Sequence, residues 1–447
     1  DCDADGFDDL YITAVGPDAL WCNNGDGTFS DGSERLETNV PAWGTSAAFA
    51  DVNGDGHLDL YVVNYLADSD EHPRLCPNAA SPDGYEQCAP ALYDGVDDVL
   101  FLSDGMGRLT DATAAAGLAG LGGNGLGVVI SDLDGDGRVE IFVANDGEAN
   151  FLLVQDGAVA EGTPSVPRFV DRAIASGVAL NEAGFAQANM GIAAGDYDGN
   201  GTTDLYITTF FGDAKTLFSN RGGLHFEDVS RSSRLGPTGR DRLGFGTLFL
   251  DADNDGWLDL FVANGHVEDR TWMPHGEPYR MRPQLYRNER GGTMLDVSAW
   301  SGDYFQNEWL GRGVAIGDLD RDGKIDLAVS HQLAPSLVLR NETQTDQAAL
   351  TLRLVGVASN RNGYGARVEC VAGDTTIVRE VLSGGSFQSA SAPVVHLGLG
   401  QHPHAAVQVR WPSGIVETFR DLTGGEWILR EGGPGVPIDA GHPNGSP

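Results

Sequence analysis

The sequence predicts an all-β protein in which a β-propeller is followed by a small C-terminal β module. Three observations carry this prediction: an acidic loop recurs six times, a Gly-rich hairpin recurs beside it, and 62 of the 447 residues are Gly. Gly permits the tight turns that separate short strands, so its abundance favours a chain of many short strands. The repeats indicate that these strands are grouped into similar units.

Each acidic loop follows the pattern D-x-[DN]-x-[DN]-G-x-x-[DE]-[LI], with side-chain oxygens at positions 1, 3, 5 and 9 and Gly at position 6. The Gly lets the chain curl so that these oxygens converge. Together with the backbone carbonyl of position 7, they form the hard-oxygen shell that Ca²⁺ prefers. The predicted calcium ligands, loop by loop, are Asp1, Asp3, Asp5, Phe7 and Asp9; Asp51, Asn53, Asp55, His57 and Asp59; Asp132, Asp134, Asp136, Arg138 and Glu140; Asp196, Asp198, Asn200, Thr202 and Asp204; Asp251, Asp253, Asp255, Trp257 and Asp259; and Asp318, Asp320, Asp322, Lys324 and Asp326.

Neither an EF-hand nor simple turn formation accounts for the acidic loops as well as a calcium-binding repeat does. An EF-hand needs a bidentate Glu at position 12, whereas all six copies carry Val or Ile there. Asp residues that only form turns would not share one spacing in six places. Asn53 and Asn200 replace Asp in two loops, and the third loop, with the longer Glu140, fits the pattern least. Because each loop draws its ligands from one hairpin, we expect several Ca²⁺ ions that are mainly structural.

An apolar strand follows each loop, and the repeated hairpin supplies two more. The segments after the loops read DLYIT, DLYVV, EIFVA, DLYIT, DLFVA and DLAVS, rich in residues typical of strands. The hairpin copies span 20–31, 100–111, 217–228 and 285–296. With the strand before each loop, the unit has four strands, and such units repeated around an axis form a propeller. Six blades are visible; because the chain opens inside the first loop, a preceding strand and a seventh blade are expected upstream.

The charge of the chain excludes some classes of partner. Acidic residues outnumber basic ones 65 to 28, which gives a net charge of −37. Nucleic acid is not an expected partner, because its binding relies on Lys and Arg. An anionic membrane surface would also be repelled. No apolar run approaches the roughly 20 residues that span a bilayer, so no transmembrane segment is expected.

The cysteines indicate an oxidising compartment. Cys76 and Cys88 enclose a Pro-rich insertion that a disulfide would restrain. Cys2 and Cys22 both belong to the first blade and are expected to be able to pair, which leaves Cys370 single. Disulfides and exposed calcium loops both suit an extracellular or periplasmic location, where calcium is plentiful.

The loops and strands resemble the FG-GAP or VCBS-type calcium-binding repeats of integrin α-chain propellers. The C-terminal region carries SNRNGYGARVEC (359–370), REVLSGGSFQSAS (379–391), VVHLGLG (394–400) and VRWPSG (409–414). This series resembles the ASPIC/UnbV module at the C-terminus of cartilage acidic protein and its bacterial relatives. The resemblance covers essentially the whole chain and implies a bacterial-type member, secreted or at the cell surface, that binds calcium and has an adhesion or matrix-interaction role.

We expect three parts along the chain: the propeller over 1–344, the ASPIC/UnbV β domain over 345–430 and a tail over 431–447. Read from its residues alone, the second part alternates apolar and polar side chains. This pattern is typical of half-buried strands and predicts a small sandwich or a capping sheet.

The stretch from 264 to 290 gathers aromatic and cationic side chains in an otherwise acidic protein. A long loop of this kind at the mouth of a propeller can bind a ligand; the alternative is an ordinary insertion that balances local acidity. The candidate ligand-binding residues are His266, Arg270, His275, Tyr279 and Arg280.

The sequence thus predicts a secreted calcium-binding propeller scaffold for extracellular binding or adhesion, whose partner is an unknown protein, glycan or small molecule. The alternative is a calcium-dependent enzyme, such as a cyclase or a lyase-like or C–C bond-forming activity, acting on a small molecule in the axial pocket. His266, His275, Tyr279 and Arg280 would then serve as acid–base or anion-stabilising groups. Convergence of these side chains in one concave pocket would favour the enzyme.

Overall fold

The computed structural model describes residues 1–38, 42–67, 73–157, 166–273 and 276–438. It confirms the all-β prediction. In the part of the chain that it describes, the α-helices are two single turns, α1 (Ala173–Ser176) and α2 (Leu235–Thr238). No helix of these residues is long and apolar enough to cross a membrane.

Six antiparallel sheets follow one another along the chain and form the blades of a β-propeller. The first contains β1 (Leu10–Ile12), β3 (Ala19–Asn23) and β4 (Phe29–Asp31). The second contains β2 (Val15–Gly16), β5 (Ala42–Ala50), β6 (Asp59–Asn64), β9 (Val99–Ser103) and β10 (Leu109–Asp111). The third contains β11 (Gly125–Ser131), β12 (Glu140–Asn145), β13 (Phe151–Gln155) and β14 (Phe169–Asp171).

The remaining blades repeat this order from the axis outward. The fourth contains β15 (Asn189–Gly195), β16 (Asp204–Thr209), β17 (Thr216–Asn220) and β18 (Phe226–Asp228). The fifth contains β19 (Gly244–Leu250), β20 (Asp259–Asn264), β21 (Gln284–Asn288) and β22 (Met294–Asp296). The sixth contains β23 (Gly311–Gly317), β24 (Asp326–His331) and β25 (Leu337–Leu339). The seventh blade remains a prediction.

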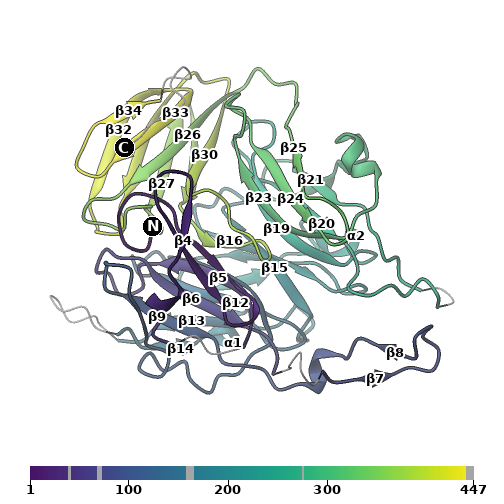
Figure 1. The fold of residues 1–447 in the computed structure, drawn as a ribbon. Helices are drawn as coiled ribbons and strands as arrows, with labels where there is room; N and C mark the ends of the chain where they lie inside the picture. Colours follow the sequence, from purple (N-terminus) through teal and green to yellow (C-terminus); the bar gives the residue numbers. More distant parts are fainter. Residues whose placement is uncertain (39–41, 68–72, 158–165, 274–275, 439–447) are drawn as a thin grey trace.

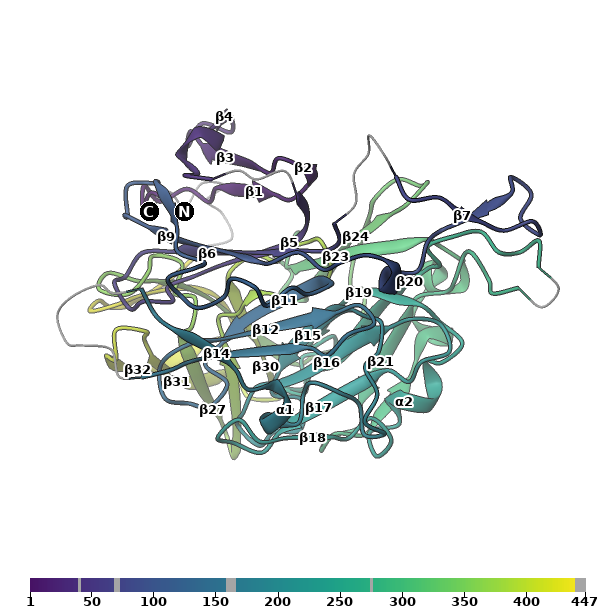
Figure 2. The same cartoon turned by 90° about the horizontal axis from the view of Figure 1, so that it is seen from below.

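The inner strands β5, β11, β15, β19 and β23 pack side by side around a common axis, and the first sheet lies at one end of this row (Figures 1 and 2). Gly in these strands permits the close approach. A Cβ on Gly191 would lie 2.1 Å from the carbonyl oxygen of Phe245, and one on Gly246 would lie 2.2 Å from that of Arg312. Both glycines belong to the short apolar segments that precede the acidic loops, so the sequence pattern there reflects blade packing.

Side-chain amides join consecutive blades. Each amide belongs to a residue at, or just beyond, the end of the third strand of its blade. It donates to a backbone carbonyl of the preceding blade, namely that of the second residue of the acidic loop. The pairs are Gln155 with Val52 (3.0 Å), Asn220 with Leu133 (2.7 Å), Asn288 with Tyr197 (2.7 Å) and Asn341 with Ala252 (2.8 Å). Since a buried amide hydrogen bond contributes about 1 kcal/mol, this repeated contact stabilises the order of the blades.

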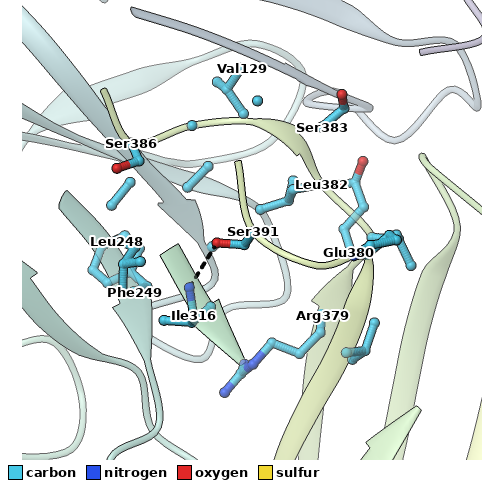
Figure 3. Close-up of a pocket in the computed structure, with 18 of the residues that line it drawn as sticks. Val129, Leu248, Phe249, Ile316, Arg379, Glu380, Leu382, Ser383, Ser386 and Ser391 are labelled. Carbon is cyan, nitrogen blue, oxygen red and sulfur yellow. Dashed lines mark hydrogen bonds between the residues drawn. The ribbon is translucent and has the colours of Figure 1, made fainter. Parts of the chain in front are cut away.

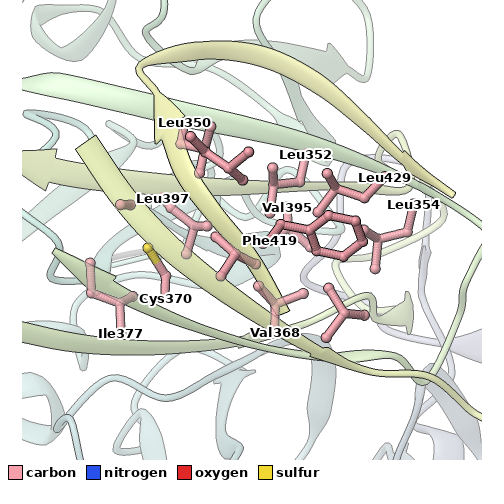
Figure 4. Close-up of a cluster of buried hydrophobic side chains, with 14 of the residues drawn as sticks. Leu350, Leu352, Leu354, Val368, Cys370, Ile377, Val395, Leu397, Phe419 and Leu429 are labelled. Carbon is pink, nitrogen blue, oxygen red and sulfur yellow. The ribbon is translucent and has the colours of Figure 1, made fainter. Parts of the chain in front are cut away.

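The C-terminal strands form a sandwich of two sheets, shown in yellow-green beside the propeller in Figure 1. One sheet contains β26 (Ala348–Val355), β30 (Val394–Gly400), β33 (Gly425–Arg430) and β34 (Gly435–Pro437). The other contains β27 (Arg367–Ala372), β28 (Thr375–Glu380), β31 (His404–Arg410) and β32 (Val416–Thr423). Leu352, Val368 and Leu397 lie in the shared core (Figure 4). The strand β34 lies in the segment 431–447, for which the sequence predicted a tail.

A segment of this sandwich enters the propeller. Residues 382–393, which we call the axial strap, connect β28 to β30 and run along the inner strands (Figure 3). Within the strap, β29 (Ser383–Gly384) pairs with β11, and the N–H of Ser386 donates to the carbonyl of Ile192 at 2.6 Å. The hydroxyls of Ser389 and Ser391 accept from the N–H groups of Val314 (3.1 Å) and Ile316 (3.1 Å). The strap therefore contacts the inner strands of the third, fourth and sixth blades.

The side chain of Phe387 anchors the strap. It packs on Phe245 of the fifth blade, with ring centroids 4.9 Å apart. The two rings belong to a buried apolar cluster with Tyr65, Leu126, Met190, Leu243 and Met281. At Gly313 of the sixth blade, the atom nearest to an added Cβ is the carbonyl oxygen of Phe387, at 3.0 Å. At Gly191 and Gly246, the corresponding neighbour is a backbone carbonyl of the next blade. Beside Gly313, the strap therefore takes the place that a next blade would occupy.

The disulfide between Cys76 and Cys88 is confirmed; it bridges the insertion that carries β7 (Cys76–Pro77) and β8 (Tyr85–Glu86). The predicted pairing of Cys2 with Cys22 is wrong, because both thiols are free and buried. The sulfur of Cys22 lies against Gly32, where an added Cβ would be 2.5 Å away. Cys370 is free within the sandwich core, and burial raises the pKa of its thiol to about 11.

A carboxylate closes the loop that contains the SNRNGYG motif. One oxygen of Glu431 accepts from the N–H groups of Val357 (2.7 Å), Ala358 (2.8 Å) and Ser359 (2.9 Å). The other accepts from the hydroxyls of Ser359 and Ser413. Burial alone would raise the pKa of Glu431, but these hydrogen bonds outweigh it and lower the pKa to about 2 from an ordinary 4.5.

We predict that Glu431→Gln destabilises the sandwich by about 3 kcal/mol at neutral pH, because the lowered pKa measures how strongly the folded state prefers the carboxylate. This contribution is present above pH 4.5 and is lost as the pH falls toward about 2. Urea unfolding at several pH values measures it. Glu369→Gln, on the exposed face of β27, is the control; equal stability of the two variants at neutral pH would contradict the prediction.

Candidate metal centres and axial cavity

Five of the acidic loops connect an inner strand to the second strand of its blade, and the first loop directly precedes the corresponding strand β1, so the loops lie on one side of the propeller. In each loop the first carboxylate draws the chain into a tight turn. In the second loop, for example, Asp51 accepts from the N–H groups of Gly54 (2.7 Å) and Gly56 (2.8 Å). Asp55 in turn accepts from the N–H of His57 at 2.9 Å. These local hydrogen bonds explain why Gly stands at position 6.

The carboxylate of position 9 joins the loop to the third strand. Asp204 accepts from the N–H of Tyr197 (3.1 Å) and from the N–H of Asn220 (2.7 Å). Burial, followed by the charge of Asp198, raises the pKa of Asp204 to about 8. Burial raises that of Asp251 to about 7. In both carboxylates, burial outweighs the hydrogen bonds that they accept.

In five loops, three carboxylates each place one oxygen so that all three oxygens lie within 4.8 Å of one another. The clusters are Asp1, Asp3 and Asp5; Asp132, Asp134 and Asp136; Asp196, Asp198 and Asp204; Asp251, Asp253 and Asp255; and Asp318, Asp320 and Asp326. One oxygen of Asp3 is buried and has no hydrogen-bond partner. Such an oxygen set fits a hard divalent cation such as Ca²⁺.

One loop departs from this arrangement. The second forms no such three-carboxylate cluster among the described residues, because Asn53 stands at position 3 and its amide donates to Asp55 at 3.0 Å. The third loop, expected to fit least, forms its cluster from positions 1, 3 and 5, as the first and fifth loops do, and Glu140 at position 9 accepts from the N–H of Leu133 at 2.8 Å. Burial raises the pKa of Glu140 to about 9.

At position 7, where the sequence predicted carbonyl ligands, two side chains turn onto the neighbouring carboxylate. Arg138 lies 2.6 Å from Asp136, and Lys324 lies 3.1 Å from Asp322. These cations are partly exposed at the rim of their loops, so they offset the charge of position 5 while the three-carboxylate clusters keep their geometry.

The predicted ligand-binding residues lie at the opposite end of the propeller, beyond β20. His266 is fully buried; its Nε2 lies 2.8 Å from a carboxylate oxygen of Glu277. Burial lowers the pKa of His266. Arg270 lies 3.0 Å from Glu268 and 3.7 Å from Glu277, so the structure brings His266 and Arg270 into one ion-pair network.

The other candidates do not complete a site around this network. Tyr279 contributes its backbone carbonyl, which accepts from the N–H of His266 at 2.9 Å, and Arg280 is exposed. His275 lies outside the described residues. Instead, Arg312 of β23 lies over the ring of Phe245 at 4.1 Å and donates to the carbonyl of His266 at 3.1 Å. Sequence patterns gave no signal for Arg312.

A cavity of about 220 Å³ lies on the axis, between the inner strands and the strap. Most of its wall is apolar, with Leu248, Phe249 and Ile316 among the lining residues (Figure 3). Its charged groups are Asp196, Asp251, Arg367, Arg379 and Glu380. None of the four predicted ligand residues that the structure describes lines this cavity. The inner strands supply part of the wall, and the REVLSGGSFQSAS segment, which the sequence offered only as a mark of resemblance, supplies much of the rest.

Two families match this chain. FG-GAP-like repeats match residues 1–62, 132–207, 196–262 and 251–329, and the ASPIC and UnbV domain matches residues 356–433. The repeats cover more than half of the chain, which therefore belongs to the FG-GAP repeat proteins and carries a C-terminal ASPIC/UnbV domain.

Cartilage acidic protein 1 of Homo sapiens is 26% identical over 392 residues, which are 86% of this chain and 52% of that protein. The Mus musculus protein of the same name is 27% identical over 380 residues, which are 83% of this chain and 52% of the relative. The chain thus spans about half the length of these relatives.

A solved structure of an Agrocybe aegerita lectin that recognises non-reducing terminal N-acetylglucosamine is 14% identical, with a TM-score of 0.40, over 76% of this chain and 78% of the lectin. Trypanosoma rangeli sialidase is 10% identical, with a TM-score of 0.36, over 74% of this chain and 53% of the sialidase.

Proposed function

We propose that this chain is a secreted β-propeller scaffold whose acidic loops bind calcium and whose loop surfaces serve extracellular binding or adhesion. The observation that carries the proposal is the set of five three-carboxylate clusters, all on one side of the propeller. The disulfide and the similarity to cartilage acidic protein 1 support an extracellular or periplasmic location. We retain the division into a propeller (1–344) and an ASPIC/UnbV domain that begins at 345, but we extend the domain beyond the expected boundary at 430, because β34 (Gly435–Pro437) belongs to its sandwich.

Electrostatics explains why the loops need a cation. Two carboxylates about 5 Å apart repel one another by roughly 3 kcal/mol at an effective dielectric constant of 20. Each cluster holds three such groups, and the raised pKa of Asp204 and Asp251 reflects the same repulsion together with burial. A bound divalent cation supplies the opposite charge. Oxygen-only ligands on flexible loops favour Ca²⁺ over Zn²⁺, which prefers nitrogen and sulfur.

The opposite end of the propeller offers a surface for partners. Half-buried aromatic side chains surround the apolar cluster that holds Phe387, namely Trp43, Tyr93, Phe210 and Phe211. Aromatic side chains with one accessible edge are suited to contact protein or glycan surfaces. A rigid propeller would hold them in a fixed arrangement, and this supports the role of a scaffold.

The alternative, a calcium-dependent cyclase or lyase-like enzyme with an axial active site, has less support. His266 is fully buried beside Glu277, and Arg280 is exposed. The axial strap also occupies the axis that a substrate would need. We therefore favour the scaffold.

Titration calorimetry of chelator-treated protein tests the calcium proposal. We expect Ca²⁺ to bind at several sites, and the double variant Asp253→Asn/Asp255→Asn to lose one of them, because it removes two carboxylates from the fifth loop. Asp374→Asn, an exposed Asp in the turn between β27 and β28, is the control and should leave the stoichiometry unchanged. Wild-type protein that takes up no calcium would refute the proposal.

A further inference from the structure

Arginines of the ASPIC/UnbV domain reach four of the six acidic loops. Each contacts a different loop: Arg361 lies 3.3 Å from Asp1, Arg410 lies 2.8 Å from Asp132, Arg367 donates to the carbonyl of Gly201, and Arg379 donates to the carbonyl of Gly256 at 3.0 Å. They come from separate positions along 361–410, so the contact is a property of the whole domain face. The domain is thus docked on the side of the propeller that carries the acidic loops.

Three of these arginines donate to backbone carbonyls of the loops, whether or not they also contact a carboxylate. Arg367 and Arg379 use the carbonyl of position 6, and Arg410 also reaches the carbonyl of Gly135 at 3.2 Å. These oxygens are not among the predicted calcium ligands. They face the domain only because the loop is tightly curled, so the contacts depend on the shape of the loop. In the fourth and fifth loops, an arginine and a bound cation can therefore occupy the same loop together.

The fifth loop has the closest contact with the domain. The N–H of Gly400 donates to the carbonyl of Asn254 at 3.0 Å, and Gln347 donates to the carbonyl of Asp253 at 2.9 Å. A Cβ on Gly398 would lie 2.1 Å from a carboxylate oxygen of Asp251. Only a glycine lets β30 pass so near, which gives the VVHLGLG motif a structural reason.

The same contacts lead directly into the axial strap. Arg379 and Glu380 end β28, and the strap begins two residues later. Glu380 accepts from the hydroxyl of Ser131 (2.7 Å) and from the N–H of Asp132 (3.2 Å), so it joins the third loop to the base of the strap. Contacts of Arg379 and Glu380 therefore link the acidic loops to the axial strap.

We propose that calcium in the third, fourth and fifth loops controls the docking of the ASPIC/UnbV domain and keeps the axial strap seated. This inference rests on the proposed calcium binding. Without the cation, repulsion between the carboxylates opens the loops, and the carbonyls of Gly135, Gly201 and Gly256 turn away from their arginines. The strap then leaves the inner strands and opens the axial cavity.

Hydrogen exchange of the full chain, followed by mass spectrometry, measures the seating of the strap. The N–H groups of Gly385 and Ser386 donate to the carbonyls of Val128 (2.7 Å) and Ile192 (2.6 Å), so they report on it directly. We expect exchange of this segment to become at least tenfold faster when calcium is chelated and to slow again when calcium is restored. Unchanged or slower exchange, in protein that calorimetry shows to bind calcium, would overturn the inference.

A matched pair of loop variants separates docking from general loosening. Among the described residues, no hydrogen bond or ion pair connects the sixth loop to the domain. With calcium present, Asp253→Asn/Asp255→Asn in the fifth loop should release the strap, whereas Asp320→Asn/Asp322→Asn in the sixth should not. Equal release by both variants would overturn the inference. Calorimetry that shows no calcium binding by the wild-type chain would instead refute the proposed function.

Discussion

Removal of calcium is expected to lower the midpoint of thermal unfolding by about 10–15 °C, the largest effect that we predict. A ligand present at 100 times its Kd stabilises the folded state by about 2.7 kcal/mol per site. Five filled clusters would together contribute about 13 kcal/mol. The shift in the unfolding midpoint is this free energy divided by the entropy of unfolding. With roughly 2.1 cal/mol/K per residue and 447 residues, the shift is about 10–15 °C.

Calorimetric scans in calcium and in a chelator measure this shift. A monovalent salt at matched ionic strength is the control, because general screening of the net charge of −37 would also stabilise the protein to some degree. Calcium at millimolar concentration should restore the original midpoint. Equal midpoints in calcium and chelator would contradict the role of the loops as structural calcium sites.

Replacement of Phe387 by Ala is the second large effect, with an expected loss of about 3–5 kcal/mol in the free energy of unfolding. The ring is buried between the strap and the propeller, where it packs on Phe245. Its removal would leave a cavity among residues of several blades, which can collapse only in part. Because the ring fixes the strap, the variant should also become sensitive to proteolysis within 382–393.

Phe185→Ala is the matched control, since Phe185 is 69% exposed and loses little packing on truncation. Chemical denaturation of both variants in calcium measures the difference. A loss below 1 kcal/mol for Phe387→Ala would show that the strap is not anchored at this point.

The sequence was sufficient for the features that depend on short-range patterns. Repeated loops and alternating strands are local signals, and the six sheets, the turns at Gly54 and Gly56 and the Cys76–Cys88 bridge all follow from them. The third loop, with its longer Glu140, was expected to fit the pattern least, but it forms a cluster from positions 1, 3 and 5; among the described residues it is the second loop, with Asn53, that forms none.

Long-range contacts could not be predicted from the same patterns. The strap pairs with strands more than 250 residues earlier in the chain, such as Ile130 with Ser383, and nothing in its Ser- and Gly-rich sequence specifies that partner. His266 was expected to face a ligand, but it is buried beside Glu277 of the same stretch and Phe210 of the fourth blade, and the contact with Phe210 is not visible in the sequence. Likewise, Cys2 and Cys22 belong to the same blade but form no disulfide, because the direction of each side chain depends on its neighbours.

The amides that join the blades show a third case. Asn220 and Asn288 stand at the same place in the repeated hairpin, so the repetition was visible. Their role was not, because Asn in a Gly-rich hairpin is ordinarily attributed to the turn itself. Only the arrangement of consecutive blades brings their amides to the loop of the blade before.

The most direct test of the central claim, that the repeated acidic loops hold calcium, is a crystal structure of the protein grown in calcium, with anomalous scattering used to locate the ions. We expect an anomalous peak within the first, third, fourth, fifth and sixth loops, surrounded by the oxygens of the carboxylate clusters. Loops that bind no ion, or ions that bind only outside them, would contradict it.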